Sequence, residues 1–205
     1  MERREHLLEV ATAVLLALAT IGTAWCAYQS ARWNGVQAID FSEANTARSE
    51  SVKQANLAAQ LTAIDVGMWL QYVAAISEGN QRLADFISAR FRPEFKVAND
   101  AWLATKPLRN ANAPSSPFVM SEYSLAAQKR AQGLTSTAEQ KTEDARGANQ
   151  QSDNYVGLTV IFASVLLFGG VGGKFESFNL RVVTLAIGAF VLVGLAFTLA
   201  TYPIY

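Results

Sequence analysis

The sequence predicts an all-α integral membrane protein with three transmembrane helices and a long helical hairpin or bundle outside the membrane. Three uncharged apolar stretches, at 10–28, 155–173 and 182–205, predict the membrane helices. Apolar residues at helical period between the first two stretches predict the outer hairpin. The composition agrees, because 51% of the 205 residues are apolar and only 17% are charged, against about 25% in an average soluble domain.

The three stretches have the length that a membrane requires, with 19, 19 and 24 residues. About 20 helical residues cross a hydrocarbon core about 30 Å thick. The first stretch has a second interpretation as a cleaved signal peptide, because Arg3 and Arg4 precede an Ala/Leu-rich run. We expect a retained helix, since Trp25, Cys26 and Tyr28 occupy the place where small residues would mark cleavage.

Basic residues predict the orientation of the chain in the membrane. Arg3 and Arg4 lie before the first stretch, and Lys174 and Arg181 lie in the short link between the other two. Short basic segments stay in the cytoplasm, so the long connection is expected outside. The prediction is a multi-pass protein of the bacterial inner (cytoplasmic) membrane with three parts. These are a cytoplasmic N-terminus with the first transmembrane helix (1–28), an extracytoplasmic helical domain (29–154), and the other two transmembrane helices with a short cytoplasmic turn (155–205).

Aromatic residues near the ends of the stretches predict where the membrane meets water. Tyr and Trp are enriched at this depth because their rings are amphipathic. The expected interface residues are Trp25, Tyr28, Trp33, Tyr155 and Tyr202.

Two further features lie within the stretches. Gly169 and Gly173 have the small-xxx-small spacing that allows close helix packing, as do Ala196 and Ala200. Glu9 is the one acid at the edge of a stretch. Intramembrane carboxylates often mark ion paths, but Glu9 is near enough to the polar N-terminus to reach the interface, which is our expectation.

The extracytoplasmic part is predicted to contain two long helical arms. The first continues from the membrane to about Ser77, where Glu78-Gly79-Asn80 predicts a break. Ser121 is the expected N-cap of the second arm, which continues into the membrane. The expected intervening elements are short helices at 81–91 and 94–105 and a loop at 110–117.

Both arms carry apolar stripes typical of a coiled coil or helical bundle. The predicted stripes are Val52, Ala55, Ala59, Val66, Trp69 and Val73 in the first arm, and Ala127, Ala131, Leu134, Ala138, Ala145 and Ala148 in the second. Because alanine buries little area, such a stripe needs a partner that comes very close. Two interpretations stay open, an intramolecular bundle and an interface between subunits.

The residues give no pattern typical of an enzyme or a metal site. One Cys and one His exclude an intramolecular disulfide framework and a Cys/His zinc cluster. The glycines at 169–173 lack the Gly-Lys-Ser/Thr ending of a phosphate-binding loop. A net charge of zero argues against nucleic-acid binding. We therefore predict a non-enzymatic protein with no catalytic, cofactor-binding or metal-binding residues.

Residues 24–35 carry the pattern Ala-Trp-x-x-Tyr-Gln-x-x-x-Trp-x-Gly. This segment resembles uncharacterised bacterial inner-membrane proteins of three or four helices. The resemblance covers about a dozen residues and the hydropathy layout, and it implies the class of membrane protein without an activity. Within it, Gln29 and Arg32 could meet lipid phosphates or a neighbouring subunit.

These observations predict a self-associating structural or scaffold protein of the inner membrane. Its expected partners are membrane lipid, other copies of the chain and a membrane or periplasmic protein. Two alternatives stay open. Small and hydroxyl-bearing faces of several copies could line a channel or transport complex. An extracytoplasmic sensor would need a partner, because the predicted cytoplasmic parts are short.

Overall fold

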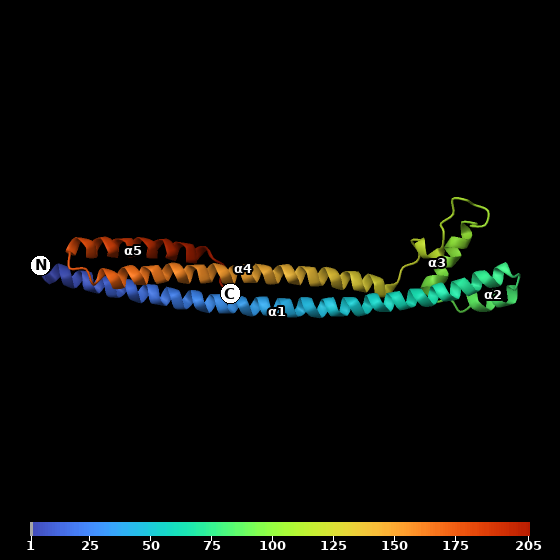
Figure 1. The fold of residues 1–205 in the computed structure, drawn as a ribbon, viewed down its shortest axis with the longest axis horizontal. Coiled ribbons are helices and arrows are strands. Elements are labelled where there is room, and N and C mark those ends of the chain that lie inside the picture. The colour runs from blue at the N-terminus through green and yellow to red at the C-terminus, as the bar shows by residue number, and fades with distance from the viewer. Residues whose placement is uncertain (1) are drawn as a thin grey trace. The chain divides into compact units, whose positions relative to one another are not determined.

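The computed structural model describes residues 2–205, and these form five α-helices and one 3₁₀ turn (Figure 1). The elements are α1 (Glu2–Ser77), α2 (Gln81–Ser88), α3 (Pro93–Ala104), the 3₁₀ turn η1 (Pro117–Val119), α4 (Ala126–Gly172) and α5 (Phe178–Thr201). The described residues include no β-strand. The predicted all-α class is therefore confirmed.

Three helices, α1, α4 and α5, are long and apolar enough to cross a membrane. Their most apolar windows are only 11%, 33% and 11% buried inside the protein. A helix surrounded by water normally hides its apolar face. These three helices instead leave large apolar side chains exposed, among them Ile21 at 66%, Val160 at 64% and Phe190 at 82%. Such surfaces are those of a multi-pass membrane protein.

The chain divides into two compact units. Unit 1 contains the residues up to Ser42 together with Lys141–Tyr205, and unit 2 contains Glu43–Gln140. Helices α1 and α4 contribute residues to both. This division follows packing, whereas the boundaries predicted at 28 and 154 mark the expected membrane surface and stay a prediction.

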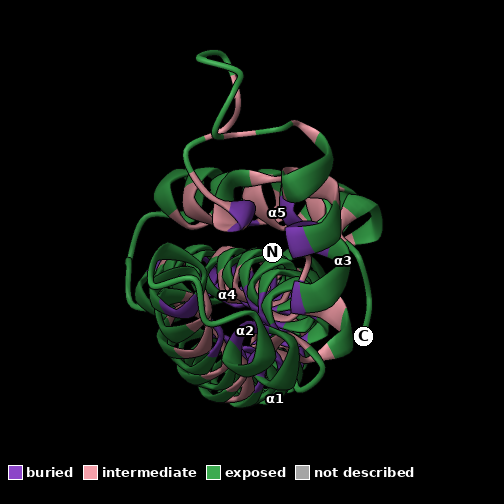
Figure 2. Ribbon diagram, turned by 90° about the vertical axis from the view of Figure 1, so that its right-hand side faces the viewer, coloured by how far each residue is buried: buried purple, intermediate pink, exposed green. Residues whose placement is uncertain are grey.

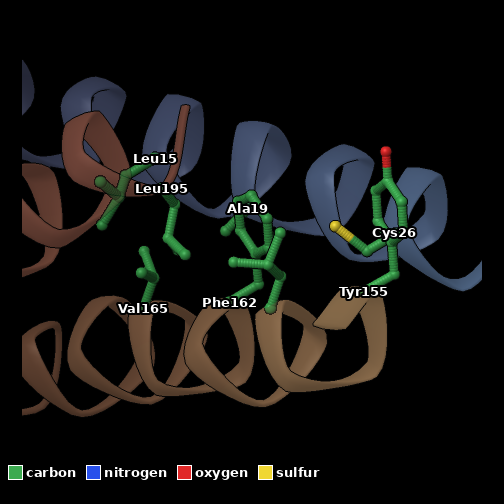
Figure 3. Packing of buried hydrophobic residues seen from close by; sticks show 8 residues of the cluster. Leu15, Ala19, Cys26, Tyr155, Phe162, Val165 and Leu195 are labelled. Atoms are coloured by element: carbon green, nitrogen blue, oxygen red, sulfur yellow. The ribbon is translucent and has the colours of Figure 1, made fainter. Parts of the chain in front are cut away.

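The interior of unit 1 lies between α1, α4 and α5 (Figure 3). Its core residues are Leu15, Ala19, Cys26, Tyr155, Leu158, Phe162, Val165 and Leu195. A glycine lets α1 and α4 approach closely, because a Cβ at Gly22 would lie 2.4 Å from the Phe162 ring. In Figure 2 exposed residues cover most outer helix surfaces, and buried residues gather where helices face each other.

The interior of unit 2 has two parts. Along α1 and α4 most buried residues are small, among them Ala44, Ala47, Ser51 and Ala58 on one helix and Ala127, Ala131 and Ala138 on the other. The Ser51 hydroxyl lies 2.9 Å from the Ala131 carbonyl, which shows how closely the two backbones approach. The second part is an aromatic cluster around α2, α3 and η1, with Phe95 fully buried.

The predicted stripe of the second arm is confirmed by the burial of five of its residues, with Leu134 half-buried, whereas most of the predicted stripe of the first arm lies outside the buried face of α1. Val52 is 56% exposed, and Ala55 and Ala59 are exposed as well. The buried face carries Ser51, Ala58 and Asp65 instead, at intervals of seven residues. A search for apolar residues at helical spacing does not find this face, because two of its positions are polar. Ser51 and Asp65 can be buried because they form hydrogen bonds inside the protein.

The break after Ser77 is confirmed and has a clear physical cause. Gly79 adopts a positive φ of 71°, and the Asn80 side chain accepts a hydrogen bond from the Leu83 amide at 3.1 Å. This pairs an αL glycine with an N-cap asparagine, so one helix ends and the next begins. The predicted loop at 110–117 is also confirmed, apart from the 3₁₀ turn that starts at Pro117.

Several predicted ends differ from the structure. Ser121 is not an N-cap: its hydroxyl bonds the Glu122 side chain, and α4 begins at Ala126. Helix α2 ends at Ser88 rather than 91. Helix α5 begins and ends four residues before the predicted stretch. It ends at Thr201 because Pro203 disfavours a helical conformation in Tyr202.

Candidate functional site

The resemblance segment and the end of the chain meet in unit 1, in a cluster that we name the aromatic–polar junction. Its residues are Gln29, Ser30, Arg32 and Trp33 of α1, Ser152 and Tyr155 of α4, and Tyr202, Pro203 and Tyr205 after α5. It joins all three candidate membrane-spanning helices through side chains rather than through apolar contact alone.

Two serines connect α1 to α4 inside the junction. Ser30 and Ser152 are buried, and their hydroxyl oxygens lie 2.9 Å apart. Ser152 also donates to the Ser30 carbonyl at 3.1 Å, so Ser30 is the donor between the hydroxyls. Each small side chain keeps the backbones close, and each polar atom has its partner on the other helix. The pair therefore fixes the register of α1 against α4, since a shifted register would leave buried hydroxyls without partners.

Gln29 connects α1 to the segment after α5. Its side chain is fully buried, and its Oε1 accepts a hydrogen bond from the Tyr205 amide at 3.0 Å. The Tyr205 ring lies edge-on to Trp33 at 5.7 Å and beneath the Arg32 guanidinium at 4.4 Å. Gln29 Nε2 and Trp33 Nε1 are buried donors without an acceptor among the described residues.

Tyr155 connects α4 to the same segment after α5. It is fully buried, and its hydroxyl donates to the Pro203 carbonyl at 3.0 Å. Its ring is perpendicular to that of Tyr202, with centroids 5.7 Å apart. Together with Gln29, Tyr155 holds the non-helical segment 202–205 against the middle of α1 and of α4.

The five predicted interface aromatics fall into two groups. Trp25 and Tyr28 are 40% and 54% exposed and lie against each other, with ring centroids 6.0 Å apart. Trp33 and Tyr202 are half-buried and Tyr155 is fully buried, all three within the junction. Only the first two point outward. The depth of all five in a membrane stays a prediction.

The predicted packing residues also differ from one another. A Cβ at Gly169 would lie 2.7 Å from Leu16, so Gly169 packs against α1. A Cβ at Gly173 would meet only the Gly170 carbonyl. Ala196 and Ala200 are exposed. Glu9 is exposed as well, which leaves its predicted position at the interface open.

Sequence reasoning missed an ion pair in unit 2. Asp65 is 1% exposed, and both its oxygens accept from Arg92, at 3.0 and 2.8 Å. The Tyr123 hydroxyl lies 2.9 Å from the same carboxylate and 3.2 Å from the Thr62 hydroxyl. One pattern in the sequence could have indicated this pair. Ser51, Ala58 and Asp65 are seven residues apart, which places the carboxylate on the same helix face as the two small residues.

The electrostatics of this cluster fit a structural role. Burial raises the pKa of Tyr123, and its hydrogen bond to the Asp65 carboxylate raises it further. The hydrogen bond from Arg92 to Asp65 raises the pKa of the guanidinium. A carboxylate held by a bidentate arginine and a tyrosine hydroxyl is poorly placed to accept a proton from a substrate.

Aromatic rings surround this ion pair on one side. Phe95 stacks on Phe118 with centroids 5.1 Å apart, and Tyr123 meets the Phe118 ring edge-on at the same distance. Such pairs contribute about 1 kcal/mol each beyond their buried area. The aromatic cluster therefore holds the segment before α4 against α3.

Across residues 2–205, no group of three or more His, Cys, Asp or Glu side chains is placed to bind a metal ion. Comparison of the chain with protein-family models, with curated proteins and with solved structures gave no match.

Proposed function

We propose that this chain is a non-enzymatic scaffold of the bacterial inner membrane that associates with copies of itself. Three membrane helices anchor it, with its N-terminus in the cytoplasm and residues 29–154 outside. The exposed apolar windows of α1, α4 and α5 support the anchor, because lipid is the medium in which such surfaces are stable. The short basic segments at 3–4 and 174–181 support the orientation.

The observation that carries self-association is an uncovered apolar face on α1 in unit 2. Its residues are Val52, Ala55, Ala59, Ala63, Val66, Leu70 and Val73, and we name it the α1 stripe. Leu70 is 57% exposed and Val73 is 39% exposed, so this unit does not cover them. The interval of seven from Val52 through Ala59 and Val66 to Val73 suits packing against another helix.

A groove beside the α1 stripe supports the same proposal. It has a volume of about 470 Å³ and lies between Ala55, Ala59 and Ala63 of α1 and Tyr123 and Leu125. Small residues on one wall let a second backbone come close, and the tyrosine and leucine supply contact area. A helix of a second copy fits these requirements, since its own stripe is apolar and at the same spacing.

The test is the mass of the full chain in a mild detergent or a lipid nanodisc, measured by light scattering over a range of concentrations. We expect an oligomer. Ala59→Glu with Leu70→Glu should weaken association at least tenfold, because it places buried charges at the interface. Gln60→Glu with Gln71→Glu adds the same charge to adjacent exposed positions and should leave the mass unchanged. A monomer at every concentration for the unaltered chain contradicts the proposal.

The orientation has its own test in intact cells. A membrane-impermeant maleimide should label Ser115→Cys, in the exposed loop after α3, and should not label Lys174→Cys until the membrane is opened. The reverse pattern would place unit 2 in the cytoplasm.

A further inference from the structure

A second feature of unit 2 is a cleft that shares only Val73 with the α1 stripe. It has a volume of about 460 Å³ and lies between the end of α1, the end of α3 and the turn that follows α3. Sites for small molecules typically have volumes of about 300–1,000 Å³ and mostly apolar walls with a few polar groups. The cleft has this size and this kind of lining.

The apolar wall is held in place by contacts behind it. Trp102 lines the cleft, and its indole N–H donates to the Pro114 carbonyl at 2.7 Å. Trp69 meets the Trp102 ring edge-on at 5.7 Å, which fixes it from the other side. Ile76 and Leu103 complete the wall and are 39% and 41% exposed, so large apolar area is open to a ligand.

The turn after α3 supplies the charged groups of the cleft, and both are cations. Lys106 and Arg109 line the cleft, and no Asp or Glu lines it. Neither cation has a salt-bridge partner among residues 2–205. The Lys106 carbonyl accepts from the Arg109 amide at 2.8 Å and from the Asn110 amide at 3.0 Å, which makes the turn compact.

Lys106 occupies a backbone position that normally takes glycine. It follows the last residues of α3 with a φ of 54°, the left-handed conformation found after a helix C-cap. A side chain there costs about 1 kcal/mol relative to glycine. The backbone conformation at Lys106 is therefore unfavourable for a residue with a side chain, and yet this position carries a cation at the cleft.

We propose that this cleft binds a small amphiphile with an apolar body and an anionic head. The body lies against Trp102, Leu103 and Ile76, and the carboxylate or phosphate head pairs with Lys106 and Arg109. Charge selects the ligand class, since a cationic amphiphile would meet two like charges. The proposal is tested separately from self-association, because the cleft shares only Val73 with the α1 stripe.

The experiment uses the full chain in an amphipol, so that no free detergent competes. The direct probe is 8-bromooctanoate, whose bromine quenches tryptophan fluorescence. Saturable quenching is expected, and Trp102→Phe should remove most of it. Octanoate and octyl phosphate then compete with the probe, which distinguishes a carboxylate head from a phosphate head. Octanol and octylammonium should compete at least tenfold more weakly.

The charge variant decides the outcome. Lys106→Gln with Arg109→Gln should weaken octanoate binding about tenfold, the combined effect of two exposed ion pairs, and leave octanol competition unchanged. Lys129→Gln with Arg130→Gln removes two exposed cations from α4 and should have no effect. Equal competition by octanol and octanoate, or equal loss in the two double variants, would overturn the proposal. Occupation of the cleft by a second copy would also overturn the proposal. In that case Trp102→Phe would leave the probe's quenching intact, and Leu103→Glu would lower the mass of the particle.

Discussion

The two units solve the same packing problem in different ways. In unit 1 the core cluster is apolar, and the polar contacts beside it are hydroxyl and amide groups such as Ser30, Ser152 and Gln29, while one ion pair, Asp40 with Lys141, lies farther along α1 and α4. In unit 2 a buried carboxylate, Asp65, bonds to Arg92 and Tyr123 beside a cluster of aromatic rings. Outside these cores, both units expose apolar side chains, but in unit 2 they lie among many exposed charges.

The comparison shows that the interactions able to hold helices in one arrangement depend on the medium around them. When lipid covers the outer face, apolar burial does not distinguish inside from outside, so small residues and hydrogen bonds must fix the helices against each other. When water covers it, apolar burial drives packing, and a buried ion pair can then fix the arrangement of the loops. Three experiments break or sharpen this contrast.

The largest effect is expected from Asp65→Ala. It leaves the Arg92 charge, which is 22% exposed, and the Tyr123 hydroxyl without their partner. Breaking a buried pair from one side costs about 3 kcal/mol. Hydrogen exchange should accelerate in α2, α3 and the aromatic cluster and stay unchanged in unit 1. Asp100→Ala, which removes an exposed pair with Lys96, should cost under about 1 kcal/mol. Equal protection in the two variants would contradict the structural role of Asp65.

The next effect concerns close helix approach in unit 1. Gly22→Val places a side chain where the Phe162 ring lies and should cost about 1–3 kcal/mol. The measurement is the thermal unfolding temperature of the full chain in one detergent. Gly35→Val is the matched control, because a Cβ there meets nothing within 4 Å. That variant should gain a few tenths of a kcal/mol from helix propensity. If the unfolding temperature fell by the same amount in both variants, α1 and α4 would not meet at Gly22.

The smallest effect is a pH dependence that belongs to unit 2. The pKa of Tyr123 is raised by burial and by Asp65, so above about pH 10 the unfolded chain loses this proton before the folded chain does. The stabilisation is complete below the unfolded pKa and is lost as the pH rises through the folded pKa. The urea concentration that unfolds unit 2 should therefore fall above about pH 10, and Tyr123→Phe should reduce this alkaline sensitivity. Tyr28→Phe changes an exposed ring and should leave the profile as it was. Identical alkaline profiles for Tyr123→Phe and the unaltered chain would contradict this assignment.

Sequence reasoning was strongest where a single physical requirement dominates. The length of the apolar stretches was sufficient to identify α1, α4 and α5 as candidate membrane helices. Gly79 and Asn80 identified the break after α1, because glycine readily adopts a positive φ and asparagine is a preferred N-cap residue. The alanine stripe of α4 was visible because every buried position from Ala127 to Ala148 is apolar.

By itself the sequence determined the helical class, the number of long apolar helices and the face of α4 that is buried, since each depends on local periodicity and composition. Only the tertiary structure decided the buried face of α1, the meeting of Gln29 with Tyr205, the pairing of Asp65 with Arg92 and the cleft at Lys106. These features depend on residues far apart in the chain. A polar side chain becomes a good interior residue only when its partner arrives, and that partner has no fixed spacing in the sequence.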